Sequence, residues 1–403
     1  MSVSLTMAVL AAFVAYSLFS KSIGRGVLTL PILFTACGLL LSEPLKAAGS
    51  PETIHEGKRL LAEVTLILVL FADASHVRFK RLSQNWKIPA RMLLIGMPLT
   101  IALGTAVAYG LFPEGGLAVA LLTAAVLTPT DAALGQAVVT SPEVPPHLSQ
   151  TINVESGLND GLALPFVLLG AIVASSAVPG EAHTEGLALE ALREVVLGPL
   201  AGIAVGWAAA KLLDWAQSRD MINEPAAGVV FLCTAFMAYL MAVTIGGNGF
   251  IAAFVGGMAF GNTYRHDIHF IEEFMEGAGQ ILTMLAFLVF GAVLLPDGLA
   301  HAVPATVVLA LVFLSVVRMG PIYVSLAGSG LAPREKLFLG WFGPRGLASL
   351  LFTLIMMDEF DFPGEEELLA CVSLTVGLSI LLHGLSAHPL AARIGRMSRA
   401  AME

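Results

Sequence analysis

Long apolar runs follow one another along almost the whole chain, separated by short polar loops. A helix that crosses a bilayer needs roughly 20 apolar residues, and on that rule the runs predict about thirteen membrane helices. They lie at approximately 3–20, 27–42, 59–77, 91–112, 115–140, 149–178, 193–213, 226–246, 248–263, 277–295, 299–327, 336–357 and 367–390. The loops are too short for a separate soluble domain. The pattern therefore predicts an all-α polytopic membrane protein.

The first run is expected to stay in the mature protein. Residues 3–20 have no basic segment before them and no small-residue cleavage site after them. A removed signal peptide typically has both a basic segment and such a cleavage site. We therefore interpret residues 3–20 as a membrane helix.

Prolines interrupt two of the runs. Pro129 lies in TPTDA (128–132), and Pro344 lies in GPRG (343–346). A proline inside a helix removes a backbone hydrogen bond and breaks it. Paired interruptions in two halves of a chain are typical of inverted-repeat transporters, which bind their cargo where the broken helices meet. We therefore expect inverted repeats with two crossing broken helices, in the fifth and twelfth runs.

Small residues at helical spacing mark a second feature of the packing. GPLAGIAVG (198–206) and GGMAFG (256–261) place glycine and alanine one turn apart. Such spacing lets two helix backbones approach closely. We expect tight helix–helix contacts at both segments, without a binding role.

Acidic side chains gather around the first interruption. Asp131, Glu155 and Asp160 lie within apolar surroundings, where carboxyl groups are rare unless they handle ions or protons. At 100° per residue, Glu155, Ser156, Asn159 and Asp160 form one polar arc on a single helix. This region is therefore the predicted cation and proton site.

The oxygen atoms near this arc suit an alkali cation. Such an ion needs several hard oxygen ligands to replace its water. Asp160 offers a carboxylate, Ser156 and Thr130 offer hydroxyls, and the interrupted backbone at 128–130 is expected to offer free carbonyls. A carboxylate that holds a proton or a cation, but not both, couples the two ions. No nucleotide or redox cofactor is needed.

The charge at the site predicts the stoichiometry. Asp160 is preceded by the neutral Asn159, so the pair carries one acid. One cation exchanged for one proton moves no net charge. A second acid at position 159 would allow two protons per cation.

The remaining charges near the site are expected to be structural. Asp131 follows the first break, where the start of a half-helix is positive, and Arg345 follows the second, where it could face a half-helix C-terminus. Glu155 needs a cationic partner at depth. Arg318 and Arg345 are the basic residues inside the runs, and we favour Arg318.

Three further residues complete the candidates. Thr128 is expected to have a structural role at the first break. Glu63 and Asp73 lie in the third run, and the sequence leaves their roles open. Asp73 is close to the inner end of that run, which is compatible with a position that faces water.

Composition supports the membrane interpretation and excludes other classes. The 403 residues are 57% hydrophobic and 13% charged, with a mean hydropathy of +0.83, whereas about a quarter of the residues of a soluble domain are charged. The formal net charge is −9 and there is no basic patch, so nucleic acid is not an expected partner. Cys37, Cys233 and Cys371 lie far apart in apolar runs, and we expect buried side chains rather than a metal site or disulfide.

The loops predict the orientation. Most of the 21 Lys and Arg residues fall in loops on the same side as the C-terminus. Basic loops stay in the cytoplasm. We therefore expect a multi-pass protein of a bacterial-type plasma (inner) membrane, with the N-terminus outside and the C-terminus cytoplasmic.

TPTDA, ESGLNDG (155–161) and GPRG, in this order and spacing, resemble the electroneutral sodium/proton exchangers of the NhaP and NHE type. The resemblance covers essentially the whole chain. It implies a thirteen-helix inverted-repeat fold, a homodimer, and a core domain that moves against a dimerisation scaffold. The scaffold would comprise 1–90 and 181–298, and the core 91–180 and 299–403.

The resemblance also implies roles for single residues. Thr130, Ser156 and Asp160 match cation ligands, and Glu155 matches a water-mediated ligand or salt-bridge acid. Asn159 matches a residue that orients the helix, and Asp131 matches the acid of the crossing helices. Ala132 departs from the pattern, because many relatives have proline after that aspartate.

The implied function is exchange of a monovalent cation for a proton, with sodium first and lithium or potassium left open. Two alternatives remain. One is a passive cation channel. The other is an intramembrane aspartyl protease that uses Asp131 and Asp160, although neither has the neighbours typical of such enzymes. We do not expect an enzyme.

Overall fold

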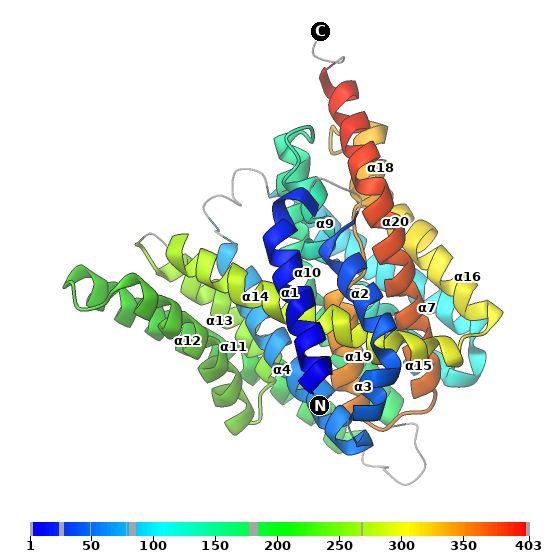
Figure 1. The fold of residues 1–403 in the computed structure, drawn as a ribbon, viewed down its shortest axis with the longest axis horizontal. Coiled ribbons are helices and arrows are strands. Elements are labelled where there is room, and N and C mark those ends of the chain that lie inside the picture. Colours follow the sequence, from blue (N-terminus) through cyan, green and yellow to red (C-terminus); the bar gives the residue numbers. More distant parts are fainter. Residues whose placement is uncertain are drawn as a thin grey trace.

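A computed structural model describes residues 3–23, 28–48, 50–77, 79, 86–176, 184–266 and 269–399, and these residues are helical or in loops, with no strand among them. Figure 1 shows the arrangement. The helices are α1 (Val3–Ile23), α2 (Leu30–Leu40), α3 (Ser42–Ala48), α4 (Pro51–His76), α6 (Lys87–Arg91), α7 (Met97–Leu111), α8 (Gly116–Val126), α9 (Ala132–Val139), α10 (Pro146–Ser175), α11 (Thr184–Ser218), α12 (Glu224–Thr244), α13 (Gly249–Thr263), α14 (His269–Val289), α15 (Leu295–Ala300), α16 (Pro304–Val312), α17 (Arg318–Ser325), α18 (Pro333–Trp341), α19 (Leu347–Glu359) and α20 (Glu365–Arg399).

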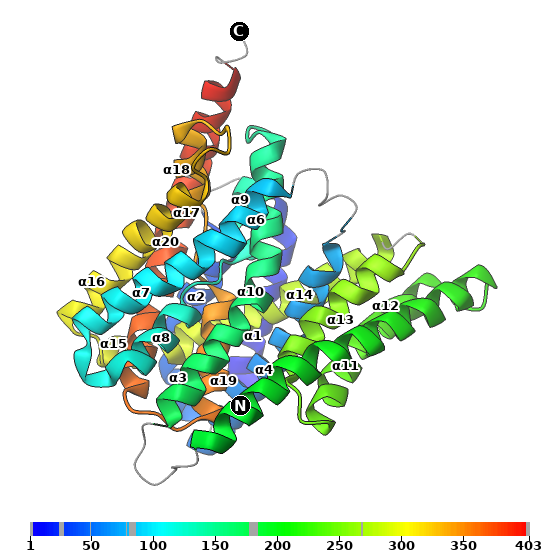
Figure 2. The same ribbon diagram turned by 180° about the vertical axis from the view of Figure 1, so that it is seen from behind.

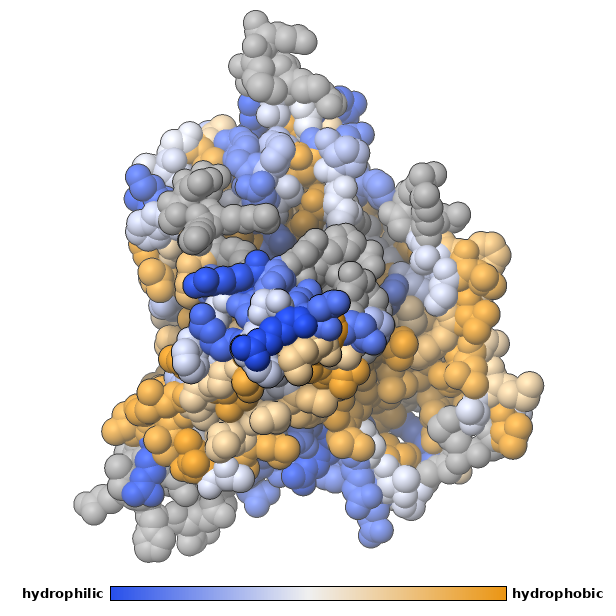
Figure 3. Space-filling view, turned by 90° about the vertical axis from the view of Figure 1, so that its left-hand side faces the viewer, coloured by the Kyte–Doolittle hydropathy of each residue, from blue (hydrophilic) through white to orange (hydrophobic). Residues whose placement is uncertain are grey.

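The described part of the chain holds eight helical stretches that are long and apolar enough to cross a membrane, together with shorter apolar helices. Apolar side chains form a band across the molecule in Figure 3, and hydrophilic ones gather above and below it. The multi-pass membrane fold is therefore confirmed, whereas the number thirteen stays a prediction. Residues 24–27, 78 and 80–85, which hold several of the basic residues used for orientation, lie outside the described residues.

Both predicted helix breaks are present. The fifth run divides into α8 and α9, and the twelfth divides into α18 and α19. Three other membrane segments stay continuous but contain a π-helical turn, at Met92–Gly96, Phe290–Leu294 and Phe313–Val317. Wide turns of this kind often occur at functional sites.

Helix α10 occupies the centre of the molecule (Figure 2). It packs against α8, α9 and α19, and on its other side against α4 and α13. Because α10 carries the predicted polar arc, this position places the arc beside both broken helices.

Glycine contacts join α4, α11 and α13 on one side of the molecule. A Cβ added at Gly206 would lie 2.1 Å from the Gly256 carbonyl oxygen. A Cβ at Gly257 would lie 2.2 Å from the Phe71 carbonyl oxygen, and one at Gly261 would lie 2.0 Å from that of Ser75. The helices touch backbone to backbone, as the small-residue segments predicted.

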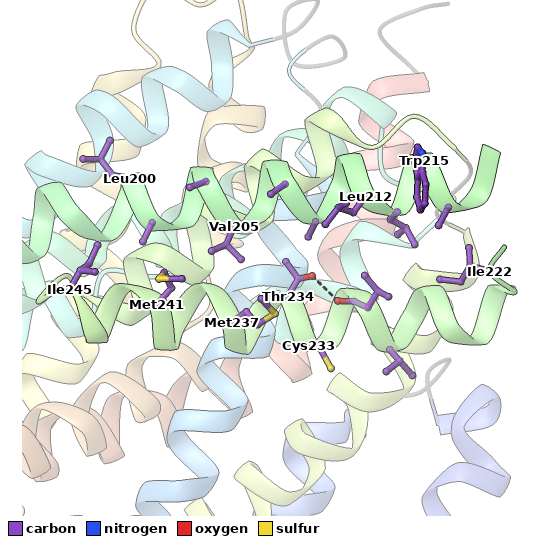
Figure 4. A pocket seen from close by; sticks show the side chains of 18 of the residues that line it. Leu200, Val205, Leu212, Trp215, Ile222, Cys233, Thr234, Met237, Met241 and Ile245 are labelled. Atoms are coloured by element: carbon purple, nitrogen blue, oxygen red, sulfur yellow. Dashed lines mark hydrogen bonds between the residues drawn. The ribbon is translucent and has the colours of Figure 1, made fainter. Parts of the chain in front are cut away.

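An apolar groove of about 940 Å³ lies between α11 and α12 (Figure 4). Leu200, Val205, Met237 and Met241 line it. Cys233 also lines the groove and is exposed, so its predicted burial is wrong. An apolar thiol can face lipid as readily as a protein core, which explains the error.

Candidate cation site

The first break is held by hydrogen bonds to its carbonyl oxygens. The Arg345 guanidinium donates through one nitrogen to the carbonyls of Thr128 (2.6 Å) and Pro129 (3.1 Å). The Ser156 hydroxyl donates to the Thr130 carbonyl (2.7 Å). The expectation of free carbonyls at 128–130 is therefore wrong for this structure, because polar groups freed at a helix break are satisfied by protein partners.

Asp131 joins the two breaks. One carboxylate oxygen accepts from the Leu347 amide (2.6 Å), and the other accepts from the Leu134 amide (3.2 Å). These amides lie in the first turns of α19 and α9, so the carboxylate faces the positive ends of two half-helices. The Asp131 amide in turn donates to the Pro344 carbonyl (2.8 Å).

Gly346 makes this junction possible. A Cβ added at Gly346 would lie 2.0 Å from an Asp131 carboxylate oxygen. The φ angle of Gly346 is −158°, which any residue can adopt. The close approach of the carboxylate therefore leaves no room for a side chain here.

The predicted polar arc of α10 faces the first break. The Thr130 hydroxyl lies 3.3 Å from the Ser156 hydroxyl and 3.4 Å from a Glu155 carboxylate oxygen. The Asn159 amide group donates to the Thr130 hydroxyl and, at 3.4 Å, to Glu155. The structure thus brings Thr130, Ser156, Glu155 and Asn159 into one hydrogen-bonded group.

Glu155 and Arg318 form a two-point ion pair. The two guanidinium nitrogens of Arg318 lie 2.8 and 3.0 Å from the two carboxylate oxygens of Glu155. Both side chains are almost fully buried, at 3% exposure. Arg318 follows the π-helical turn Phe313–Val317, and Gly343 lies so close that a Cβ there would be 2.3 Å from Arg318 Nε.

Asp160 is also buried, with 7% of its surface exposed. Within the described residues, its Oδ1 and the Oδ1 of Asn159 have no hydrogen-bond partner. Arg345, Asp131 and Glu155 are close enough to interact electrostatically with the Asp160 carboxylate. Two buried oxygens without a donor suit a cation, or a proton in the case of the acid.

Asp73 of α4, whose role the sequence left open, lies beside this group. It interacts electrostatically with both Asp160 and Asp131. A Cβ added at Gly157 of α10 would lie 3.7 Å from the Asp73 carbonyl oxygen, so the two helices touch here. An acid inside an apolar run was the available signal, and its closeness to the end of that run obscured it.

The arrangement can couple two ions at one carboxylate. Glu155 and Arg318 neutralise each other, and Asp131 is held by amides at two helix starts. Asp160 therefore remains as an acid of α10 that can change its charge. In the described residues, no group of three His, Cys, Asp or Glu side chains is arranged to hold a metal ion.

Comparison with known proteins agrees with the motifs. The family described as sodium/hydrogen exchanger, transmembrane, matches residues 8–393. A probable Na⁺/H⁺ antiporter of Schizosaccharomyces pombe is 26% identical over 313 residues, which are 75% of this chain and 41% of the relative. The K⁺/H⁺ antiporter NhaP2 of Shewanella oneidensis is 23% identical over 377 residues, which are 93% of this chain and 64% of the relative. The chain thus spans less than two thirds of the length of these relatives.

A solved structure shows the same fold. The sodium proton antiporter MjNhaP1 from Methanocaldococcus jannaschii superposes with a TM-score of 0.75 at 17% identity, covering 98% of this chain and 97% of that one. The predicted NhaP-like architecture is therefore confirmed. With a family match that extends over nearly the whole sequence, the chain belongs to the sodium/hydrogen exchanger family.

Proposed function

We propose that this protein is a secondary active transporter that exchanges a monovalent cation for a proton, one for one. The cation is sodium, with lithium and potassium as the other candidates, since the relatives are named for sodium or potassium. The observation that carries this proposal is the Asp160 oxygen, buried without a partner among the described residues beside the two helix breaks.

Asp160, Ser156 and Thr130 are the proposed cation ligands. The hydroxyls of Ser156 and Thr130 lie within 3.3 Å of each other, so a modest rotation presents both oxygens to one ion. Asp73 adds a second carboxylate nearby. Asn159 holds Thr130, and the Glu155–Arg318 pair holds α10 against α17.

Proton and cation compete for Asp160. When the cation leaves, the buried carboxylate loses the ion that offsets its charge, and protonation removes a charge that burial makes unfavourable. When a cation enters from the other side, the proton is released. The site has the same net charge with a cation bound to Asp160 as with a proton on it. Exchange is therefore electroneutral, as we expect for a single acid beside the neutral Asn159.

Alternating access requires two bodies that move against each other. We propose 91–180 and 299–403 as the moving core, and 1–90 and 181–298 as the scaffold. The contacts of Asp131 with Leu347 and of Arg345 with Thr128 support this division, because they tie the two core segments together. The glycine contacts between α4, α11 and α13 tie the scaffold segments together.

The scaffold also supplies the proposed homodimer surface. Helices α11 and α12 lie at the outer edge of the molecule (Figure 2), and the groove between them is lined by apolar side chains (Figure 4). We propose that it faces a second copy in a bacterial-type inner membrane, with the N-terminus outside and the C-terminus cytoplasmic. Native mass spectrometry in mild detergent should report a dimer, and a monomer would contradict this assignment.

Ion flux in sealed proteoliposomes tests the function. A sodium gradient should drive proton movement in the wild-type protein, and Asp160→Asn should abolish it while the protein stays folded. Asp297→Asn is the matched control, since Asp297 pairs with Lys46 at 2.7 Å at a partly exposed position outside the site. Retained exchange in Asp160→Asn would reject the proposed role.

The same assay separates the two alternatives. A leak of cations that follows an imposed membrane potential, without proton exchange, would indicate a channel. Cleavage of a membrane peptide that depends on Asp131 and Asp160 would indicate a protease. Proton movement driven by sodium, with neither of these activities, supports the exchanger.

A further inference from the structure

Helix α20 contacts all four half-helices of the two breaks, namely α8, α9, α18 and α19. Two of its buried side chains, one turn apart, reach the backbone of the second break. His383 is 1% exposed and Ser379 is fully buried. Neither was singled out by the sequence motifs.

His383 completes the end of α18. Its Nε2 lies 2.9 Å from the Trp341 carbonyl oxygen at the last residue of that helix. Nδ1 lies 3.0 Å from the Ser379 carbonyl oxygen and 3.1 Å from the Ser379 hydroxyl. We assign the imidazole proton to Nε2, which then donates to Trp341, while Nδ1 accepts from the Ser379 hydroxyl. The Trp341 ring stacks on the imidazole, with centroids 4.9 Å apart, which fixes the plane of the imidazole.

Ser379 completes the start of the next segment. Its hydroxyl oxygen accepts from the Arg345 amide at 2.7 Å. The same hydroxyl lies 3.1 Å from His383 Nδ1, which is free to accept when Nε2 carries the proton. A continuous chain of donors and acceptors therefore runs from Arg345 through Ser379 and His383 to Trp341, across the whole break.

The effect of this chain reaches the cation site through Arg345. The amide of Arg345 is held by α20, and its guanidinium donates to the carbonyls of Thr128 and Pro129, next to Thr130. A shift of the Arg345 backbone therefore moves the groups that hold the first break.

We propose that His383 and Ser379 are positioning residues of the cation site, which fix the second helix break and, through Arg345, the place of Thr130. Neither residue touches the cation. The proposal rests on the proposed function, because the place of Thr130 affects transport only if Thr130 binds the cargo.

Four variants of the whole 403-residue chain test the proposal. His383→Leu removes the donor to Trp341, and His383→Gln keeps a donor of similar reach. Ser379→Ala removes the acceptor for Arg345. Thr375→Val is the matched control, since Thr375 is buried on the same helix and its hydroxyl donates to the Cys371 carbonyl of that helix at 2.6 Å, away from the break.

The first readout does not depend on transport. Hydrogen exchange of peptides that cover 341–347, measured in detergent, should be about tenfold faster in His383→Leu and Ser379→Ala, the factor that loss of one buried hydrogen bond gives. The hydrogen exchange of Thr375→Val and His383→Gln should equal that of the wild type. Unchanged hydrogen exchange in His383→Leu and Ser379→Ala would show that these two side chains do not hold the second break.

The second readout is flux at varied cation concentration. The half-saturating concentration should rise about tenfold in His383→Leu and Ser379→Ala, with a smaller change in maximal rate, and His383→Gln should recover most of it. A loss of maximal rate alone, with unchanged half-saturation, would overturn the positioning role. If the wild type does not transport a cation against a proton, the proposed function is refuted instead. Hydrogen exchange still tests whether His383 and Ser379 hold the second break.

Discussion

The carboxylate of Asp131 lies 2.6 Å from the amide nitrogen of Leu347, so an acid of the first break caps the helix that follows the second. The two residues are far apart in sequence, and each belongs to a different half of the predicted repeat. The contact makes the two broken helices one unit, and a change at either break should be felt at the other.

Gly346→Ala should destabilise the protein, because the added Cβ would lie 2.0 Å from Asp131 and force the carboxylate away from Leu347. Loss of such a buried hydrogen bond costs about 1–3 kcal/mol. Thermal unfolding in detergent measures the effect. Gly320→Ala is the control, since an added Cβ there meets nothing within 4 Å. Equal stability of the two variants would contradict the close junction.

Arg318→Leu should be strongly destabilising, since it leaves the buried Glu155 without its partner. Breaking a buried ion pair from one side costs about 3–5 kcal/mol. Adding Glu155→Gln should recover much of that loss, because the uncompensated charge disappears. A double-mutant cycle of unfolding free energies measures the coupling. Simple additivity of the two changes would show that the pair contributes little.

The apparent affinity for the cation should weaken as pH falls, because a proton on Asp160 excludes the ion. In the acidic range, where protonation dominates, half-saturation should rise by up to about tenfold per pH unit. The maximal rate at saturating cation should change much less. Flux measured with equal pH on both sides of the vesicle gives both quantities. A half-saturating concentration independent of pH would rule out competition at one site.

Transport should not respond to membrane voltage, because Asn159 adds no charge to Asp160. Asn159→Asp should make any remaining flux voltage-dependent by allowing a second proton. That variant should also be less active, since Asn159 donates to Thr130 and Glu155, and a carboxylate there repels Glu155. Flux under an imposed potassium diffusion potential decides the matter. A voltage response of the wild type would refute the one-for-one count.

The candidate cation site could be predicted from the sequence largely because polar and charged residues are rare in apolar runs unless they have a structural or functional role. The breaks at Pro129 and Pro344, the arc from Glu155 to Asp160, and Arg318 as the partner of Glu155 were all readable as departures from the apolar pattern. Asp73 is also an acid inside an apolar run, but it lies near the end of that run, where a position that faces water was an equally good explanation.

Other features depended on three-dimensional proximity that no local pattern encodes. Ser379 and His383 lie in an apolar helix with no proline or acid nearby, and only the fold places them against Arg345 and Trp341. The carbonyls of 128–130 were expected to be free because the residue that occupies two of them, Arg345, is more than two hundred positions away in sequence.

Helix α4 packs against α13 and against α10 in unlike ways, among its several neighbours. Toward α13 its Phe71 and Ser75 carbonyls meet glycines, where an added Cβ would lie only 2.2 and 2.0 Å away, whereas toward α10 the Asp73 carbonyl would be 3.7 Å from a Cβ at Gly157. Sliding along the first boundary would drive main chain into main chain, but the second boundary has ordinary van der Waals clearance. On the proposed division, α10 belongs to the core and α4 to the scaffold, so movement of the core along this looser boundary would carry Asp160 past Asp73.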